Sequence, residues 1–333
     1  MQKGIMILDK AYQDLIYPDS ILRQIKQYID IVAQPIDRNE IMDYKDVLYD
    51  CEVIFSGWGC VRFDKQTLDL MPNLKAVFYG AGSIKGLVTD EFWNRNIVIT
   101  SAYGANAVPV AEYTLSQILF GLKGGYRQIK AYKESKKRPE RTAGFPLGCY
   151  KTTVGIISLG MIGKLVCEHL KHFDMNVIAY DPFASESTFR NLGVKKADTL
   201  EEVFQKSDVV SLHTPWLAET ENMITGAHFE LMKKHAVFIN TSRGAIVNEK
   251  EMIERLKKRN DILAVLDVTW PEPPKADSPL YYMDNVILTP HIAGTMENEC
   301  ARMGQFMADE LQRYIKGEPL IYKIDKEKSI FMA

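Results

Sequence analysis

The stretch from Thr153 to Asp181 constrains the fold more than any other part of the chain. It begins with an apolar run, T-V-G-I-I, continues through a turn of small residues, S-L-G-M-I-G, and then shows a helical pattern over 164–173. A second apolar run over 176–180 ends at an acid. β-branched runs of this kind are typical of strands buried in a parallel sheet. Strand, glycine turn, helix, strand and acid together predict a dinucleotide-binding unit of the Rossmann type.

Each part of this unit has a physical reason. Gly160 lets the backbone approach a pyrophosphate, and Gly163 lets the helix pack closely on the strand. The start of the helix, with Met161 and Ile162, offers free N–H groups and a partial positive charge to the phosphates. Asp181 lies about 20 residues past the turn, where its carboxylate can accept the ribose hydroxyls. A carboxylate there would repel a 2′-phosphate, which favours NAD over NADP.

The turn departs from the G-x-G-x-x-G pattern at its first position, which is Ser158. Serine is costly there if the backbone must take a positive φ. The alternative is an ordinary βαβ crossover in which the glycines serve only packing, because fold does not imply function. The spacing of Asp181 favours the cofactor hypothesis.

Length and composition exclude several classes of protein. A chain of 333 residues predicts two domains of ordinary size. The formal net charge of -2 gives no electrostatic footprint for nucleic acid or an anionic membrane. Five scattered cysteines without metal-ligand spacing indicate free thiols, a reducing compartment and no metal site. The N-terminus lacks the pattern of a signal peptide, and no apolar run reaches membrane-spanning length, so we expect a cytoplasmic protein.

The first hundred residues alternate between apolar runs and amphipathic stretches, which predicts a small, mostly parallel α/β domain. Two loops follow its strands. Gly80-Ala81-Gly82-Ser83 could be a nest of backbone N–H groups for a carboxylate, or a plain turn. Trp58 could form the wall of a substrate pocket, or anchor the core. Trp58, Ala81 and Gly82 are therefore candidate substrate-binding residues. The predicted strands are 4–8, 52–55, 76–79 and 97–100, and the predicted helices are 21–28, 67–70 and 87–95.

A hinge is predicted at 103–106, where Asn106 can cap a long apolar helix from Val108 to about Tyr132. This helix is suited to bridge two domains or to form a subunit interface. Beyond a loop at 141–151 the alternation resumes, and a final helix at 297–316 returns to the first domain. We therefore expect a cofactor domain, 106–295, inserted into a discontinuous domain, 1–105 plus 296–333. The later elements are strands at 209–212, 236–239, 263–266 and 286–288 and a helix at 248–259 capped by Asn248.

Four short segments follow strands of the predicted cofactor domain: H-T-P, N-T-S-R-G, D-V-T-W-P-E-P-P and P-H-I-A-G. Ligands of open parallel sheets bind at the carboxyl ends of the strands. The four segments therefore bring an arginine, two acids and a histidine to one rim. These residues are Arg243, Asp267, Glu272 and His291.

With these segments the chain resembles the D-isomer-specific 2-hydroxyacid dehydrogenases. V-G-I-I-S-L-G-M-I-G, H-T-P, I-N-T-S-R-G-A-I-V, L-D-V-T-W-P-E-P-P and T-P-H-I-A-G occur in the family's order. N-L-K-A-V-F-Y-G-A-G and N-A-V-P-V-A-E extend the resemblance, more loosely, to the first domain. It implies a Rossmann NAD-binding domain inserted into a flavodoxin-like substrate domain. It also implies NAD or NADH as cofactor and a homodimer formed through the NAD-binding domain.

The resemblance also implies roles. His291 matches the family's acid–base residue, and Glu272 matches the acid that pairs with it. Arg243 matches the residue that binds the substrate's carboxylate and reacting oxygen, which suits a planar, permanently charged donor. Asp267 matches a residue near the nicotinamide carboxamide, and Asp181 takes the adenosine ribose. Further cofactor contacts are implied for His213, Thr214, Pro215, Thr241, Ser242, Arg243, His291 and Gly294, although His213 could merely shape its loop.

The leading hypothesis is an NAD-dependent D-2-hydroxyacid dehydrogenase that reduces 2-ketoacids in the cell. An NAD(H)-sensing corepressor of the same fold is a second hypothesis. A methyltransferase, which also uses a glycine loop and an acid, is a third. The chain ends soon after its last helix, which argues against the long, feedback-regulated phosphoglycerate dehydrogenases. Glyoxylate, hydroxypyruvate, lactate-type and bulkier branched or aromatic ketoacids stay open as substrates.

Overall fold

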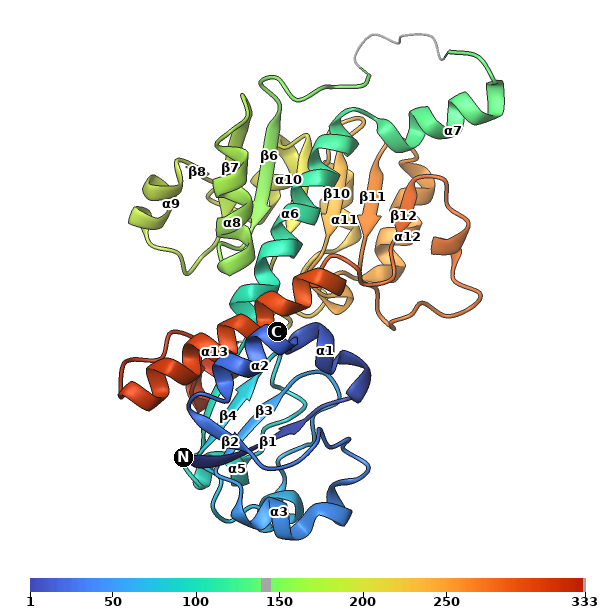
Figure 1. The fold of residues 1–333 in the computed structure, drawn as a ribbon. Coiled ribbons are helices and arrows are strands. Elements are labelled where there is room, and N and C mark those ends of the chain that lie inside the picture. Colours follow the sequence, from blue (N-terminus) through green and yellow to red (C-terminus); the bar gives the residue numbers. More distant parts are fainter. Residues whose placement is uncertain (139–144, 332–333) are drawn as a thin grey trace. The chain divides into compact units, whose positions relative to one another are not determined.

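The computed structural model describes residues 1–138 and 145–331, so part of the predicted loop 141–151 lies outside the described residues. The chain divides into two compact units. Unit 1 consists of Met1–Asn106 and Thr295–Ala333, and unit 2 consists of Ala107–Gly294. Most helices and strands of both units are labelled in Figure 1.

Unit 1 contains a six-stranded sheet with the order β13-β5-β4-β3-β1-β2. All neighbours are parallel except β13, which pairs antiparallel with β5. The order β2-β1-β3-β4-β5 is the doubly wound order of flavodoxin-like folds. The strands are β1 (Gln2–Ile7), β2 (Ile29–Ile31), β3 (Val53–Ser56), β4 (Ala76–Tyr79), β5 (Val98–Ser101) and β13 (Lys323–Ile324). The α-helices are α1 (Gln13–Ile16), α2 (Asp19–Ile25), α3 (Lys45–Asp50), α4 (Lys65–Asp69), α5 (Asp90–Asn94), α13 (Cys300–Lys316) and α14 (Lys326–Ile330).

Both faces of the unit 1 sheet are buried, as a parallel sheet requires. Ile5 and Ile7 of β1 face one core, to which α3, α4 and α5 contribute. Met6 and Leu8 face the opposite core, beneath α1, α2 and α13. Successive strand residues thus serve two cores, which explains why the strands are apolar without alternation.

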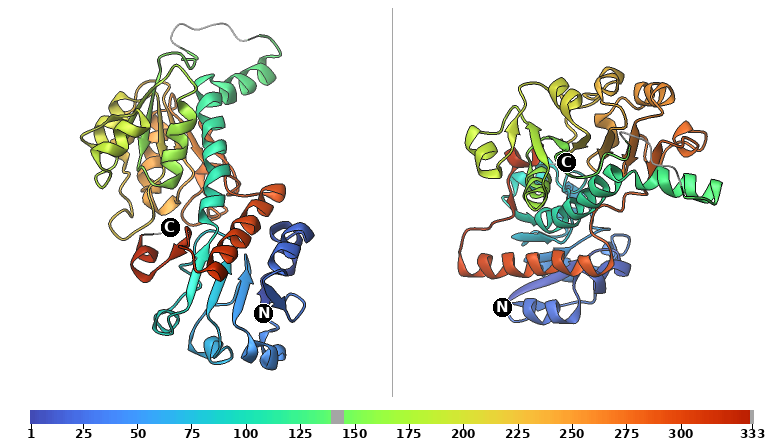
Figure 2. Two further views of the ribbon diagram at one scale, coloured as in Figure 1. Left: turned by 60° about the vertical axis from the view of Figure 1, so that its left-hand side comes forward. Right: turned by 90° about the horizontal axis from the view of Figure 1, so that it is seen from above.

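Unit 2 contains a seven-stranded, entirely parallel sheet with the order β12-β11-β10-β9-β6-β7-β8. Counted along the chain this is the Rossmann order 3-2-1-4-5-6 with one further strand. Helices lie on both sides of the sheet (Figure 2). The strands are β6 (Thr153–Ile157), β7 (Asn176–Tyr180), β8 (Lys195–Lys196), β9 (Val209–Leu212), β10 (Val237–Asn240), β11 (Leu263–Leu266) and β12 (Val286–Leu288). The α-helices are α6 (Tyr103–Leu122, shared with unit 1), α7 (Gly125–Ser135), α8 (Met161–Leu170), α9 (Glu186–Leu192), α10 (Leu200–Lys206), α11 (Gly226–Leu231) and α12 (Glu249–Lys258). The predicted fold class is confirmed.

In the turn between β6 and α8, Ser158 adopts a backbone conformation that is unfavourable for serine. Ser158 takes φ +75°, a left-handed conformation that glycine adopts freely and serine does not. The helix begins at Met161, one turn before the predicted 164, with Gly160 as its N-cap. Gly163 in this first turn has no room for a side chain, because an added Cβ would lie 2.1 Å from the Ser158 carbonyl oxygen.

The prediction of one long helix over 108–132 is wrong. α6 ends at Leu122, and α7 begins at Gly125 after Gly124 with φ +61°. Asn106 is not the N-cap, because α6 already begins at Tyr103. Its side-chain oxygen instead accepts the N–H of Thr295 at 2.9 Å. The apolar spacing continues across the break, so periodicity alone could not locate it.

All five cysteines are free, as their scattered spacing predicts. Within residues 1–138 and 145–331, no group of three His, Cys, Asp or Glu side chains is arranged to hold a metal ion. In the same part of the chain, no helix combines the length and the apolar character needed to cross a bilayer.

Candidate active site

The carboxyl edge of the unit 2 sheet brings the predicted rim residues together. Asn240, the last residue of β10, pairs in register with Leu212 of β9 and Leu266 of β11. Leu266 in turn pairs with Leu288 of β12. The four strands therefore end at one level, and the loops that carry His213, Arg243, Asp267 and His291 leave the sheet side by side.

A histidine–carboxylate pair stands at this edge. Nδ1 of His291 lies 2.6 Å from Oε1 of Glu272. The two side chains are 49% and 35% exposed, so a small molecule can reach them. The carboxylate accepts the Nδ1 proton and thereby orients the imidazole. With Nδ1 committed to Glu272, Nε2 is the atom available to another group.

Asp267 fixes the loop that carries the histidine. Its buried carboxylate accepts the Thr289 hydroxyl at 2.6 Å and the N–H groups of Ile292 and Ala293 at 2.8 and 2.9 Å. Its backbone carbonyl accepts the N–H of His291 at 3.1 Å. These bonds hold His291 at φ +54°, a conformation that is rare for a residue with a side chain. Thr289 lies within T-P-H-I-A-G, but the sequence alone does not predict it as a site residue.

Arg243 leaves the neighbouring loop as a half-buried cation. Its guanidinium donates to the Ser242 carbonyl at 2.7 Å, and Asn240 donates to the Arg243 carbonyl at 3.1 Å. Burial lowers the pKa of Arg243, and the Glu272 carboxylate opposes this shift. A cation that has lost part of its hydration gains from an anionic partner. Gly244 allows this loop to pass close to the Thr269 backbone, because an added Cβ would lie 2.0 Å from it.

Two consecutive residues of α6, Tyr113 and Thr114, contact the loop of His291 and the loop of Arg243. The Tyr113 hydroxyl lies 2.9 Å from the Thr289 hydroxyl, beside Asp267. The Thr114 hydroxyl lies 3.1 Å from the Thr241 hydroxyl, in the loop of Arg243. Sequence reasoning missed this support, because the helix and the loops are more than a hundred residues apart.

The opposite part of the same edge fits a dinucleotide. A Cβ added to Gly160 would meet no atom within 4 Å, so a ligand can approach the backbone there. The first turn of α8, with Met161, Ile162 and Gly163, directs its N–H groups to this space.

Asp181 is held beside the glycine turn by backbone donors. Its carboxylate accepts the N–H groups of Leu159, Phe183 and Ala184 at 2.7, 2.8 and 3.1 Å. Each carboxylate oxygen has lone pairs for more than one donor. The acid therefore keeps acceptor capacity for ribose hydroxyls at the position that the spacing predicts.

Unpartnered polar atoms lie in the loop after β9. His213 is 8% exposed, and its Nε2 lies 2.9 Å from the Ser211 hydroxyl. Its Nδ1 and the Thr214 hydroxyl are buried without a hydrogen-bond partner among the described residues. Burial lowers the pKa of His213 to about 3, so its ring is neutral at physiological pH. Buried polar atoms normally have partners, so this loop fits a bound polar cofactor.

The remaining cofactor candidates secure the same loops. Ser242 donates its hydroxyl to the Thr214 carbonyl. The Pro215 carbonyl accepts the Thr220 hydroxyl at 2.6 Å. Gly294 ends the loop of His291 and is the last residue of unit 2. The residues present thus fit NAD.

The candidate substrate residues of unit 1 lie at the carboxyl edge of its own sheet. Trp58 follows β3, and Ala81 and Gly82 follow β4. Ser101 donates its hydroxyl to the carbonyls of Ala81, at 2.8 Å, and Gly82. The structure therefore divides the candidates: Arg243 belongs to unit 2, and the other three belong to unit 1.

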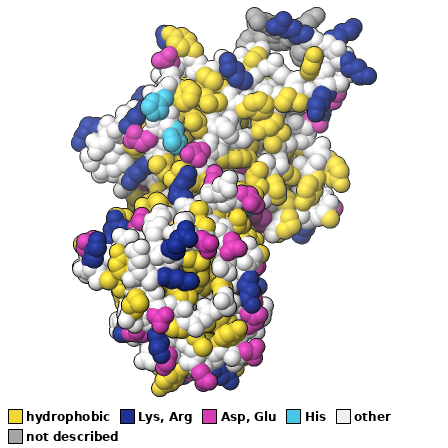
Figure 3. Space-filling view, in the orientation of Figure 1, with side chains coloured by type: hydrophobic (Ala, Val, Ile, Leu, Met, Phe, Trp, Pro, Cys, Tyr) yellow, Lys and Arg dark blue, Asp and Glu magenta, His cyan; other side chains and the backbone are white. Residues whose placement is uncertain are grey.

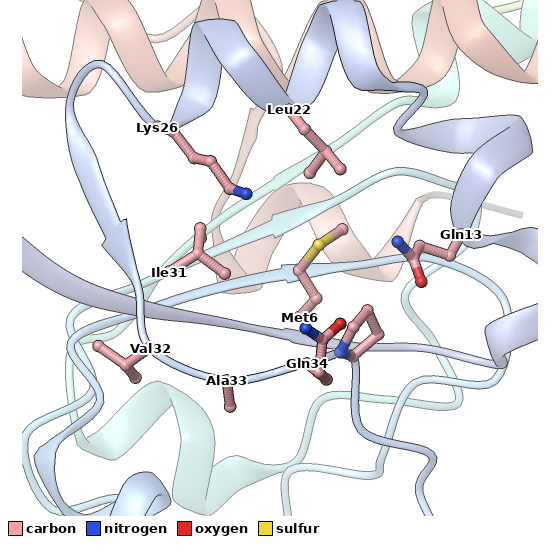
Figure 4. Close-up of a pocket in the computed structure, with 9 residues that line it drawn as sticks. Met6, Gln13, Leu22, Lys26, Ile31, Val32, Ala33 and Gln34 are labelled. Atoms are coloured by element: carbon pink, nitrogen blue, oxygen red, sulfur yellow. The ribbon is translucent and has the colours of Figure 1, made fainter.

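A separate cavity of about 330 Å³ opens in unit 1. Figure 4 shows Leu22 of α2 and Lys26, which follows α2, above it and the segment from Ile31 to Gln34 below. Lys26 is the charged member of its nine lining residues, and no predicted site residue lines it. This cavity is therefore separate from the candidate active site at the edge of the unit 2 sheet.

Comparison with known proteins identifies the family. Residues 117–293 match the family model described as "D-isomer specific 2-hydroxyacid dehydrogenase, NAD binding domain". The chain belongs to this family. A glyoxylate reductase of Thermofilum pendens is 30% identical over 338 residues, which cover 97% of this chain and 96% of the relative. The family's NAD-binding domain coincides with most of unit 2, so the methyltransferase hypothesis is excluded.

Other members of the family are longer. A D-3-phosphoglycerate dehydrogenase of Methanocaldococcus jannaschii is 29% identical over 315 residues, and the match covers 94% of this chain and 58% of that relative. The chain thus spans little more than half the length of this relative. Among solved structures, a phosphoglycerate oxidoreductase of Rhizobium etli superposes with a TM-score of 0.82 at 22% identity, covering 98% of this chain and 99% of that one. This likeness shows the shared fold.

Proposed function

We propose that the protein is an NAD-dependent D-2-hydroxyacid dehydrogenase that acts in the cell as a 2-ketoacid reductase. The observation that carries the proposal is the 2.6 Å contact between His291 and Glu272 at the sheet edge. The charge of Glu272 also acts to raise the pKa of Arg243, against the effect of burial, and so stabilises its cation. A proton carrier, its countercharge and a carboxylate-binding cation are the groups that this reaction needs.

Each residue has a defined role in the proposed reaction. Bound NADH supplies the hydride that reaches the substrate carbon. His291 donates the proton from Nε2 to the ketone oxygen, and it accepts this proton in the reverse direction. Glu272 stabilises the imidazolium and keeps Nδ1 protonated. Arg243 binds the carboxylate and polarises the reacting oxygen through two parallel N–H groups.

The cofactor residues follow from the same edge. Gly160, Met161, Ile162 and Gly163 hold the pyrophosphate, and Asp181 holds the adenosine ribose. The loops after β9, β10 and β12 and the acid after β11 surround the nicotinamide half. Their cofactor residues are His213, Thr214, Pro215, Thr241, Ser242, Arg243, Asp267, His291 and Gly294. In unit 1, we assign the loops of Trp58, Ala81 and Gly82 to the substrate.

We further propose a homodimer formed through the NAD-binding domain. α7 buries none of its residues within the chain. Ile129 and Tyr132, three residues apart on this helix, are 47% and 58% exposed. Figure 3 shows hydrophobic side chains exposed over the part of unit 2 that carries α6 and α7. Exposed apolar surface of this kind is typical of interfaces, and sedimentation at micromolar concentration tests the mass. The free thiols support a cytoplasmic location.

The decisive experiment is a panel of 2-ketoacids assayed with NADH and with NADPH. Steady oxidation of NADH by at least one ketoacid, with weaker use of NADPH, is expected. Tight NADH binding without turnover on any ketoacid would favour the corepressor hypothesis instead.

A further inference from the structure

The carboxyl edge of unit 1 contains a crevice of its own. In the order β2-β1-β3-β4-β5 the winding reverses between β1 and β3. Ligands of open α/β sheets bind at such a reversal, outside the carboxyl ends of the two strands. The loop after β1 carries Tyr12, and the loop after β3 carries Trp58. Their ring centroids are 5.0 Å apart at an interplanar angle of 67°.

Backbone contacts hold these two loops together. The N–H of Asp9 donates to the Trp58 carbonyl at 2.9 Å. Gly59 takes φ +82°, and a Cβ added to it would lie 2.6 Å from the Asp9 backbone nitrogen. Trp58 is half-buried against the cores on both faces of the sheet, and Tyr12 is 37% exposed. The aromatic pair is therefore a rigid wall that still presents ring surface.

The loop after β4, at the same edge, has backbone N–H groups that could receive an anion. Gly82 and Ser83, the partly exposed residues of the loop after β4, have N–H groups that donate to no acceptor among the described residues. Ser101 meanwhile engages the carbonyls of Ala81 and Gly82, which fixes the loop. Consecutive N–H groups without acceptors bind anions such as a carboxylate.

The sheet sets the order of these three loops along its carboxyl edge. β4 pairs with β3, and β3 pairs with β1. Neighbouring strands are about 4.8 Å apart, and the loops after β4, β3 and β1 leave the edge in that order. A substrate carboxylate that accepts the N–H groups of the loop after β4, in addition to those of Arg243, would direct the substituent along the aromatic pair.

From this arrangement we infer that the substrate is a 2-ketoacid with a bulky apolar substituent, aromatic or branched aliphatic. The inference rests on the proposed function and names its substrate class. Aromatic surface favours apolar groups, at about 25 cal/mol per Å² buried. Glyoxylate has no substituent to reach the rings. Lys10, the cation nearest to Tyr12 in the chain, is ion-paired with Glu40 at 2.7 Å.

The test compares initial rates of NADH oxidation with phenylpyruvate, 4-methyl-2-oxopentanoate, pyruvate, glyoxylate and 3-phosphohydroxypyruvate. The first two should exceed the others in kcat/KM by about tenfold or more, a usual gain for filling an apolar pocket. Trp58→Ala should lower the ratio of phenylpyruvate to glyoxylate by about tenfold, and Trp58→Phe should retain most of it. Tyr49→Ala, an exposed aromatic of the same unit, is the matched control and should leave the ratio unchanged.

The outcomes separate the inference from the proposed function. A preference for glyoxylate would overturn the inference and leave the dehydrogenase intact. A preference for 3-phosphohydroxypyruvate would do the same and would point to Arg62, which is exposed four residues beyond Trp58. Absence of turnover with all five ketoacids would reject the proposed function. Calorimetry of phenylpyruvate and glyoxylate with the NADH-loaded protein would then decide the inference, because equal affinities would overturn it.

Discussion

The two sheets of this protein are both doubly wound, and they differ in the chemistry of their carboxyl edges. The edge of unit 2 collects ionisable side chains: Arg243, Asp267, Glu272 and His291. The edge of unit 1 presents backbone N–H groups and the rings of Tyr12 and Trp58. Parallel α/β sheets bring loops to one edge whatever those loops contain, so the fold supplies the position and the loops supply the chemistry.

The two edges also differ in how their groups are held. In unit 2, side-chain hydrogen bonds fix the functional groups, as Asp267 does for the loop of His291. In unit 1, backbone contacts and one hydroxyl, that of Ser101, fix the loops. We therefore expect changes in unit 2 to affect kcat and cofactor choice. Changes in unit 1 should affect the KM and the choice of ketoacid.

The largest effect is expected for His291→Ala. Removal of the proposed proton donor should lower kcat by about 10³-fold, within the usual range for acid–base residues. NADH binding, measured by fluorescence titration, should persist. His172→Ala, at an exposed position on the same unit, is the control. Unchanged turnover would remove His291 from the mechanism.

Arg243→Lys should be next in size. The variant keeps a positive charge and loses the planar pair of donors, so kcat/KM for the ketoacid should fall by about 100-fold. Arg255→Lys, a surface change beside Glu230, should leave the steady-state constants unaltered. If both variants behave alike, charge rather than geometry is what the unit 2 edge provides.

Asp181→Asn tests cofactor choice. The substitution removes the negative charge and keeps one oxygen for the backbone donors. The ratio of kcat/KM with NADPH to that with NADH should rise by about tenfold, equivalent to ~1.4 kcal/mol. Asp198→Asn, an exposed acid of the same unit, is the comparison variant. An unmoved ratio would mean that another residue excludes the 2′-phosphate.

Ser101→Ala tests the unit 1 edge. Loss of the hydroxyl frees the carbonyls of Ala81 and Gly82, and the anion site loses its fixed shape. The KM for the ketoacid should rise about fivefold, the value of one hydrogen bond, with a smaller change in kcat. Ser20→Ala, on the surface of unit 1, should show neither change. A loss confined to kcat would contradict the division between the two edges.

The smallest effect should appear only in acid. The folded-state pKa of His213 is about 3, below the ordinary value of 6.5, so the unfolded chain takes up this proton first. Stability from this residue is complete above pH 6.5 and falls as the pH drops towards 3. Between about pH 7.5 and 5.5, the unfolding free energy of the wild type should fall by about 1 kcal/mol more than that of His213→Gln. Urea titrations at the two pH values measure this difference. An equal loss in both proteins would show that another group governs acid sensitivity.

Much of the candidate site could be predicted from the sequence because its signals are local. The spacing from Gly160 to Asp181 spans a single helix and strand, and each of the four short segments falls within one loop. A parallel sheet brings the loops after its strands to one edge. The break at Gly124 and the partner of Asn106 were missed. Helical periodicity does not show that a single residue, Gly124, is left-handed. It also does not predict the hydrogen bond between Asn106 and the distant Thr295.

The sequence by itself determined the strands, their buried apolar character, the fold class and the chemical types at the rim, because these depend on neighbours in the chain. Only the tertiary structure decided which groups support them. The Tyr113–Thr289 and Thr114–Thr241 contacts, the hold of Asp267 on the histidine loop and the Tyr12–Trp58 pair all join residues distant in sequence. Such contacts depend on how elements pack in three dimensions, and a linear pattern carries no record of that packing.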